Sequence, residues 1–176
     1  MEYRFKEPPR LHWTRGDPKM NMTIRKAQTG DLRTIQDLNH ALFESDHSSD
    51  PDLKMTWPYD EGESYFRGMI EGTIGVCFVA VENEEIIGYL AGCIKTDTPS
   101  WRPIVIAELE NMLVKSEYRS HGVGRALADK FMAWSKDNGA QSVAVSAYSK
   151  NERAIDFYKS LGFEPYCTEL ELKVDQ

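Results

Sequence analysis

Two glutamates stand in an apolar run near the middle of this sequence. Glu108 and Glu110 belong to a run that continues to Val114, and regular alternation along a strand would place both on one face of a sheet. A carboxylate beside a substrate amine is a suitable general base, because an alkylammonium has a pKa of about 10 and must lose its proton before it attacks. The plainer alternative is that both side chains lie on the solvated face of the sheet. The residues alone leave open which glutamate is the base, or whether either is.

A glycine-containing turn follows this run and leads into a helical pattern. It reads Arg119-Ser-His-Gly-Val-Gly124, and the apolar spacing of a helix begins at Val123. The first turn of a helix leaves backbone N–H groups without partners and carries the positive end of the helix dipole, so a phosphate or pyrophosphate is the expected guest. Gly122 and Gly124 have no Cβ and let the backbone come close to such an anion. The sequence therefore predicts a phosphate-binding turn directly after the glutamate-bearing strand.

The elements that must hold these groups follow two periodicities. Runs of alternating or continuous apolar residues predict strands, and apolar residues three or four apart predict helices. The predicted strands cover 23–27, 75–81, 85–95, 104–114, 142–146 and 163–172, and the predicted helices cover 32–44, 63–71, 123–137 and 151–160. A hairpin turn at Glu82-Asn83-Glu84 joins the second and third strands. This mixture predicts an α+β fold with a mixed, mostly antiparallel central sheet flanked by about four helices.

Length and charge bound the class of protein. The 176 residues suit one domain at 22–176, preceded by an extension at 1–21 that has no sustained apolar period. A net charge of −7 argues against a nucleic-acid partner, since such domains are usually basic. No apolar run approaches the roughly 18 residues of a membrane span, and the first residues lack the apolar segment of a signal peptide. We therefore expect a cytoplasmic protein without a membrane or nucleic-acid partner.

The cysteines and histidines lack the spacing of a disulfide framework or a metal site. Cys77, Cys93 and Cys167 are odd in number and far apart, which favours reduced thiols. The histidines show no ligand spacing with one another or with the cysteines, so no metal is expected. The cysteines also lack an obvious histidine partner, which argues against a covalent acyl-cysteine intermediate.

The order of the motifs carries a family likeness. The glutamate-bearing strand leads into Arg-x-x-Gly-x-Gly and a helix, and then come Asn151, Tyr158 seven residues later, and Leu161-Gly-Phe163. This order resembles the GNAT superfamily of N-acetyltransferases over residues 23–174. The resemblance implies a GNAT-like fold, acetyl-CoA as cosubstrate, and a primary amine of a small molecule or peptide as acceptor. The acetyl group would then pass directly between the two in a ternary complex.

The resemblance also implies roles for individual residues. The pyrophosphate of acetyl-CoA would lie on the glycine-containing turn, and its pantetheine arm would pair with the freed edge of the preceding strand. Tyr158 would give a proton to the leaving thiolate and Asn151 would contact the coenzyme; their plainer alternatives are a core aromatic and a helix cap. The implied coenzyme-binding residues are Met112, Leu113, Val114, Arg119, Ser120, His121, Gly122, Val123, Gly124, Arg125, Asn151 and Tyr158, and the implied catalytic residues are Glu110, Glu108 and Tyr158.

The acceptor is expected to bind beside the acidic loop at 44–63. This loop holds several aspartates and glutamates together with Trp57 and Tyr59, which suits a cationic amine through charge attraction and cation–π contact. A solvated loop explains the same acids. The rival function is a non-catalytic acyl-CoA-binding or sensing module that keeps the turn and has lost the chemistry. The residues leave the oligomeric state open, with a homodimer among the alternatives.

Overall fold

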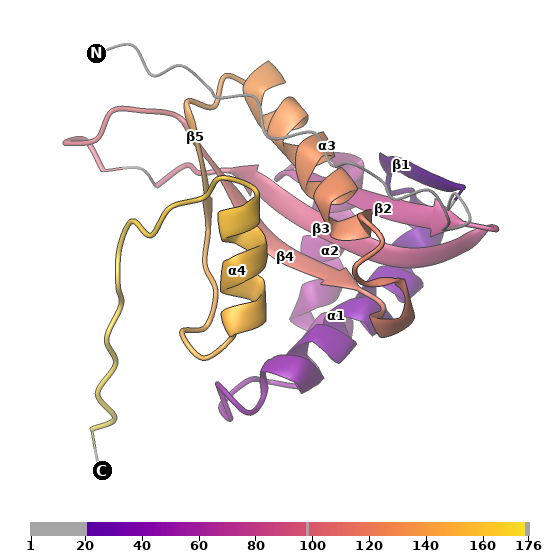
Figure 1. Cartoon of the computed structure of the whole chain (residues 1–176), viewed down its shortest axis with the longest axis horizontal. Coiled ribbons are helices and arrows are strands. Elements are labelled where there is room, and N and C mark those ends of the chain that lie inside the picture. The colour runs from indigo at the N-terminus through magenta and orange to yellow at the C-terminus, as the bar shows by residue number, and fades with distance from the viewer. Residues whose placement is uncertain (1–20, 98, 175–176) are drawn as a thin grey trace. The chain divides into compact units, whose positions relative to one another are not determined.

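A computed structural model of the chain describes residues 21–97 and 99–174. These residues belong to two compact units, 21–148 and 149–174, whose positions relative to each other are not determined (Figure 1). The larger unit holds the β-sheet, and the smaller one holds the helix α4 (Glu152–Ser160). The extension expected at 1–21 lies outside the described residues except for Asn21, so the boundary predicted there stays a prediction.

The larger unit is built on one mixed sheet. Its strand order is β1-β2-β3-β4-β5; neighbours are antiparallel as far as β4, and β5 is parallel to β4 (Figure 1). The strands are β1 (Met22–Lys26), β2 (Val76–Glu82), β3 (Glu85–Ile94), β4 (Ile106–Val114) and β5 (Ser142–Val145). The predicted α+β class with a mostly antiparallel sheet is confirmed.

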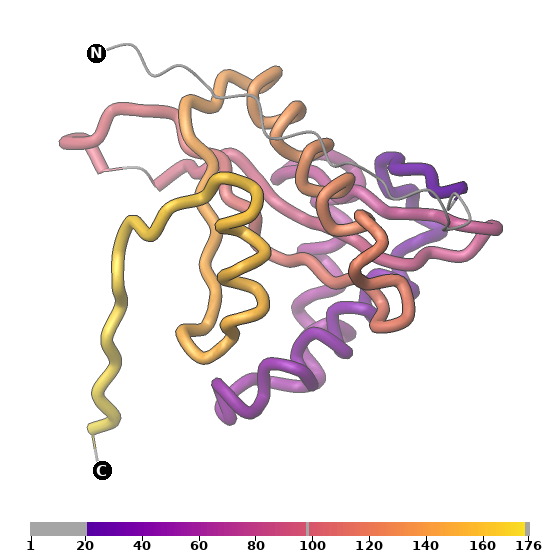
Figure 2. The backbone as a smooth tube through the Cα atoms, viewed as in Figure 1, coloured from indigo at the N-terminus to yellow at the C-terminus, as the bar shows by residue number. Residues whose placement is uncertain are grey.

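Helices cover both faces of this sheet. The helices α1 and α2 lie on one face and α3 lies on the other (Figure 2). The buried side chains of Val79 and Tyr89 point toward α1 and α2, and Phe131 of α3 approaches Gly92. The α-helices of this unit are α1 (Leu32–Asp46), α2 (Glu61–Glu71) and α3 (Val123–Asp137), and the short 3-10 helices are η1 (Thr29–Asp31), η2 (Trp57–Tyr59) and η3 (Ser116–Tyr118).

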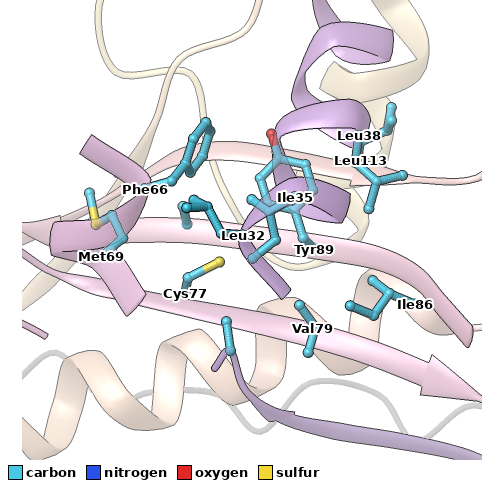
Figure 3. Packing of buried hydrophobic residues seen from close by; sticks show 12 residues of the cluster. Leu32, Ile35, Leu38, Phe66, Met69, Cys77, Val79, Ile86, Tyr89 and Leu113 are labelled. Atoms are coloured by element: carbon cyan, nitrogen blue, oxygen red, sulfur yellow. The ribbon is translucent and has the colours of Figure 1, made fainter. Parts of the chain in front are cut away.

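The core between α1, α2 and the sheet is closely packed. Ile35 of α1, Phe66 of α2 and Tyr89 of β3 are each fully buried and belong to one cluster with Leu113 of β4 (Figure 3). The α1 residues are spaced so that one stripe of the helix faces the sheet, as an amphipathic helix requires. This packing fixes the positions of α1 and α2 over β4, the strand that carries the two glutamates.

The hairpin between β2 and β3 has the predicted turn. Asn83 and Glu84 take positive φ angles of 48° and 66°, which is the conformation of a two-residue mirror-image turn. Glutamate is an unusual residue at such an angle, because its Cβ crowds the backbone there. The hairpin therefore forms despite a local conformational cost at Glu84.

The strand predicted at 163–172 is absent from the structure. In the smaller unit, the described residues after α4 have no regular secondary structure, and Leu170 and Leu172 are 91% and 85% exposed. The alternation that predicted a strand is present, but a strand also needs a neighbour that completes its backbone hydrogen bonds, and these residues have none within their unit. The prediction of α4 and of its cap is correct, since Asn151 Oδ1 accepts a hydrogen bond from the Ala154 N–H at 3.0 Å.

Candidate active site

Glu110 is the extra residue of a β-bulge. Along β3, Ala91 pairs with Asn111 and the next residue, Gly92, pairs with Leu109, which leaves Glu110 without an opposite residue. Leu109 faces α3 together with Gly92, whereas Asn111 faces α1 and α2 together with Ala91. A bulge adds one residue on one strand and re-aims the side chains that follow it. Here it brings Glu110 and Asn111 side by side on β4, close to α2.

β4 leaves its parallel neighbour at the same point. The pairing between β4 and β5 ends at Leu109 with Val145, while β4 runs on to Val114 (Figure 1). From Glu110 onward, one edge of β4 pairs with no described strand. Met112, Leu113 and Val114, which were expected to contact the pantetheine arm, lie in this freed stretch. Backbone N–H and C=O groups on such an edge can pair with an extended ligand.

The turn after β4 contains two residues in the left-handed conformation. Ser120 and Gly122 take φ angles of 66° and 83°, and Gly122 is the N-cap of α3. Arg119 supports the turn, because its Nε donates a hydrogen bond to the carbonyl of Val114 at 2.8 Å. The His121 ring contacts the same segment, with Nδ1 2.7 Å from the Arg119 carbonyl oxygen. The turn is thus tied directly to the end of β4.

The start of α3 is anchored in the core. Val123 is 1% exposed and packs into the core, while Gly124 and Arg125 follow it in the first turn of the helix. The backbone N–H groups of a first helical turn have no partner within the helix and carry partial positive charge. The predicted pyrophosphate-binding residues are therefore brought together in one loop and one helix start.

Glu110 accepts hydrogen bonds at both carboxylate oxygens. The Tyr65 hydroxyl of α2 donates to Oε2 at 2.6 Å, and the Cys93 thiol of β3 lies 3.5 Å from Oε1. Burial, and then the charge of Glu110, raise the pKa of Tyr65. The same two causes raise the pKa of Cys93 to about 12, so its thiol stays protonated at neutral pH. Both neighbours are neutral donors, one at each oxygen of the Glu110 carboxylate.

Glu108 is held in an ion pair. Its Oε2 accepts a hydrogen bond from Lys95 Nζ at 2.6 Å, and both side chains are partly buried, at 25% and 28% exposure. The hydrogen bond to Glu108 is the main cause that raises the pKa of Lys95. The two glutamates thus differ in their partners, a cation for Glu108 and neutral donors for Glu110.

An acidic hollow lies beside Glu110, between the end of α1, the loop after it and β4. Its volume is about 320 Å³, and Asn111 forms part of its wall next to the bulge. Asp50, on the opposite wall, accepts a hydrogen bond from the Tyr148 hydroxyl at 2.9 Å. Tyr59, which the loop composition suggested for the acceptor, does not line it and donates instead to Asp37 at 3.0 Å. The residues that line this acidic hollow are Phe43, Asp50, Asp52, Leu53, Lys54, Trp57 and Asn111.

With this geometry in place, comparison with known proteins decides the family. A sequence model described as the acetyltransferase (GNAT) family matches residues 35–163. The chain belongs to this family. The thialysine N-epsilon-acetyltransferase of Bos taurus is 29% identical over 147 residues, which are 79% of this chain and 82% of that protein. An uncharacterized N-acetyltransferase of Methanocaldococcus jannaschii is 30% identical over 100 residues, which are 57% of this chain and 44% of that protein.

A solved structure of an acetyltransferase shares the fold of this chain. It is the aminoglycoside N-acetyltransferase AAC(6′)-Iy in complex with the bisubstrate analog CoA-S-monomethyl-acetylneamine, with a TM-score of 0.69 at 18% identity, covering 89% of this chain and 99% of that one. The family match and this structural similarity confirm the GNAT-like fold.

The chain spans less than half the length of several curated relatives, at 44%, 39% and 37%.

Two predicted residues of this GNAT chain, Asn151 and Tyr158, belong to the smaller unit. The side-chain oxygen of Asn151 is used as the cap of α4. The Tyr158 ring packs edge-on against Phe157 and Phe163, with ring centroids 5.2 and 5.7 Å apart. Their plainer alternatives, a cap and a packed aromatic, therefore describe contacts that exist, and their roles toward a coenzyme stay predictions.

The structure also places residues that the sequence reasoning missed. Tyr65 and Asn111 contact each other and lie next to Glu110, and no motif marks either of them. A polar residue in an otherwise apolar strand was the available signal for Asn111.

Among the described residues, none of the helices has the length and apolar character of a membrane span. That part of the chain also contains no cluster of histidine, cysteine and acidic side chains suited to a metal ion.

Proposed function

We propose that this protein transfers the acetyl group of acetyl-CoA to a primary amine, by direct attack in a ternary complex. The amine nitrogen attacks the thioester carbonyl carbon, so that a C–N bond forms and the C–S bond breaks. Glu110 takes the proton that the ammonium must lose, directly or through a water, and Tyr158 gives a proton to the departing thiolate. The second proton, which leaves the nitrogen as the amide forms, restores Tyr158 through solvent. A backbone N–H of the freed β4 edge, near Met112, stabilises the developing oxyanion.

One observation carries this proposal: the freed edge of β4 begins at the bulge that carries Glu110 and ends at the turn before α3. An extended arm laid along Met112–Val114 would have its pyrophosphate end at the turn and its reactive end beside Glu110. β4 would therefore position both the coenzyme and the base. The CoA-derived ligand of AAC(6′)-Iy, a protein of the same fold, supports acetyl-CoA as the donor.

The difference in partners favours Glu110 over Glu108 as the base. Glu108 is engaged in a short ion pair with Lys95, so a proton taken at Glu108 would leave a partly buried ammonium unpaired. Glu110 is exposed, and no described lysine, arginine or histidine lies within ion-pair distance of it. It can take a proton without breaking an ion pair.

The acidic hollow is the proposed acceptor site. Asp50 and Asp52 supply negative charge, and Phe43 and Trp57 supply apolar and aromatic surface, so the hollow suits an amine that carries a cationic group. Its wall includes Asn111, the residue next to Glu110 in sequence. Thialysine, the named substrate of the bovine relative, and acetylneamine, part of the analog bound to AAC(6′)-Iy, both fit this class.

Release of free thiol from acetyl-CoA tests the proposal. The purified chain is mixed with acetyl-CoA and, in turn, thialysine, spermidine, an aminoglycoside and a peptide with a free N-terminus. Thiol release that depends on one of these amines, with the acetylated amine detected by mass spectrometry, is the expected result. Coenzyme binding without thiol release for any amine would favour the acyl-CoA-binding module instead.

The variants Glu110→Gln and Glu108→Gln form a matched pair for the base. Both remove one charge from β4, but a general base contributes about 10² to 10⁴ to the rate. Glu110→Gln should therefore lower kcat at least about 100-fold, most strongly at low pH where fewer amines are neutral. Glu108→Gln should change it less than about tenfold, because it removes an ion-paired group. The reverse order would assign the base to Glu108, and two small effects would remove both from that role.

A further inference from the structure

A chain of hydrogen bonds joins the acidic hollow to Glu110. Asn111, which lines the hollow, donates from Nδ2 to the Tyr65 hydroxyl at 2.9 Å, and Tyr65 donates to Glu110 Oε2 at 2.6 Å. At its other end, Asn111 Oδ1 accepts from Asn39 Nδ2 at 3.2 Å, and Asn39 is fully buried in α1. In each of the three bonds, the donor is the residue farther from the carboxylate. Bonds aligned in this way polarise one another, so the last donor is strengthened.

We propose that Tyr65 is the positioning residue of Glu110: it holds the carboxylate in one orientation beside the hollow where the acceptor amine binds. This inference rests on the proposed function, in which Glu110 is the base. An exposed glutamate on a bulge would otherwise exchange between several rotamers. A base contributes to the rate only in the rotamer that reaches the proton, so a donor that selects this rotamer raises kcat.

Tyr65 is itself held firmly enough to act in this way. Its ring packs against Trp57 and Phe66, with ring centroids 5.5 and 4.9 Å apart. Burial and the charge of Glu110 raise the pKa of its hydroxyl, so Tyr65 keeps its proton over the whole neutral range. Because the hydroxyl accepts from Asn111, its single hydrogen is left for Glu110.

The groups that face Glu110 come from three elements. Tyr65 approaches from α2, Cys93 from β3, and the ion pair of Glu108 with Lys95 lies near Cys93 at the β3–β4 ladder. Replacing Lys95 or Glu108 would change the formal charge near the site. Tyr65→Phe removes only one hydroxyl and leaves the ring in the aromatic cluster. It is therefore the cleanest test of the proposed role.

The first experiment reads the carboxylate without any turnover. Carbon-13 NMR of the glutamate side chains of the full chain is recorded at neutral pH, with Glu110→Gln identifying the Glu110 signal. In Tyr65→Phe this signal should change in position or width, because the carboxylate loses the donor that selects one rotamer. Tyr59→Phe, which removes a hydroxyl bonded to the exposed Asp37 outside the hollow, should leave the signal unchanged.

The second experiment reads the consequence for the reaction, with acetyl-CoA and the amine of the panel that gives the highest turnover. Tyr65→Phe should lower kcat at least about tenfold near neutral pH, with the KM for acetyl-CoA within about twofold of the parent. In the Glu110→Gln background, Tyr65→Phe should have no further effect, since a residue that acts through Glu110 has nothing left to position.

The outcomes separate this inference from the proposed function. An unchanged Glu110 signal in Tyr65→Phe overturns the inference, whatever the kinetics show. A rate loss that persists in the Glu110→Gln background also overturns it and marks Tyr65 as a packing residue. If the parent chain acetylates none of the amines, the proposed function fails. The NMR signal still decides whether Tyr65 fixes the orientation of the Glu110 carboxylate.

Discussion

Alanine at Gly122 should weaken coenzyme binding by an amount that backbone strain alone does not explain. Gly122 has a φ of 83° at the start of α3, and Gly139 has a φ of 81° just after its end, where an added Cβ would meet nothing within 4 Å. An L-residue in this conformation costs about 1–2 kcal/mol, and alanine recovers about 0.4–1 kcal/mol by restricting the unfolded chain. Gly122→Ala and Gly139→Ala should therefore each lose about 1 kcal/mol of stability, or about 2–4 °C in Tm.

The two variants should differ in their affinity for acetyl-CoA. In the proposed site, a Cβ at Gly122 stands between the pyrophosphate and the N–H groups at the start of α3. Each hydrogen bond to a charged group is worth about 1.5–3 kcal/mol, so the loss of one weakens binding about 10- to 150-fold. Gly139 lies at the opposite end of the same helix, and its variant should bind like the parent.

Calorimetric titration with acetyl-CoA, alongside thermal unfolding of all three proteins, measures both quantities. Equal affinity of Gly122→Ala and the parent would show that the pyrophosphate does not lie on this turn. Equal weakening in both variants would show that strain in α3, rather than contact with the coenzyme, governs binding. Only the combination of equal stability loss and unequal affinity supports the reasoning.

Two further predictions concern stability. Glu84→Gly should raise Tm by about 2–4 °C, because glycine removes about 1–2 kcal/mol of strain at a φ of 66° and costs about 0.4–1 kcal/mol by freeing the unfolded chain, a net gain of about 1 kcal/mol. An unchanged or lower Tm would contradict this. Asp31 accepts hydrogen bonds from Arg25 at 2.6 and 3.0 Å, and this contact is the main cause that lowers the pKa of Asp31. Its stabilisation is present above the ordinary aspartate pKa and is lost as the pH falls through the lowered one. Asp31→Asn should thus cost about 1–2 kcal/mol at pH 7 and much less near pH 3, and an equal Tm difference at both pH values would refute the pairing.

Elements that depend on local chemistry could be predicted from the sequence. The turn at Asn83 and Glu84, the cap of α4 by Asn151 and the glycine that ends α3 each follow from one or two residues and their neighbours. The turn between β4 and α3 is likewise local, because its glycine at Gly122 takes the left-handed conformation that the motif requires. These features needed no knowledge of which strands pair.

Features that depend on partners distant in sequence could not be predicted. The bond between Tyr65 and Glu110 exists because α2 packs over β4, and the ion pair of Glu108 with Lys95 depends on the register between β3 and β4. The strand expected at 163–172 failed for the same reason, since alternation describes a strand's faces and says nothing of its neighbour. In each case the pattern describes one segment by itself, and it does not identify the distant segment that this one contacts.

The bulge on β4 explains why simple alternation misplaces this site. With regular alternation, Glu108, Glu110 and Met112 would share one face, and Asn111 and Leu113 would share the other with Leu109. The structure places Leu113 in the core against α1 and Asn111 in the wall of the acidic hollow, while Leu109 faces α3.

The extra residue of the bulge, Glu110, accounts for these positions. The opposite strand offers Gly92 at this point, where an added Cβ would lie 2.4 Å from the Glu108 carbonyl oxygen and 2.6 Å from the Phe131 ring. A larger residue there could not admit both the bulged strand and Phe131. Gly92 thus permits the irregularity that sets Glu110 beside Tyr65, so the chemistry proposed for β4 depends on a missing side chain of β3.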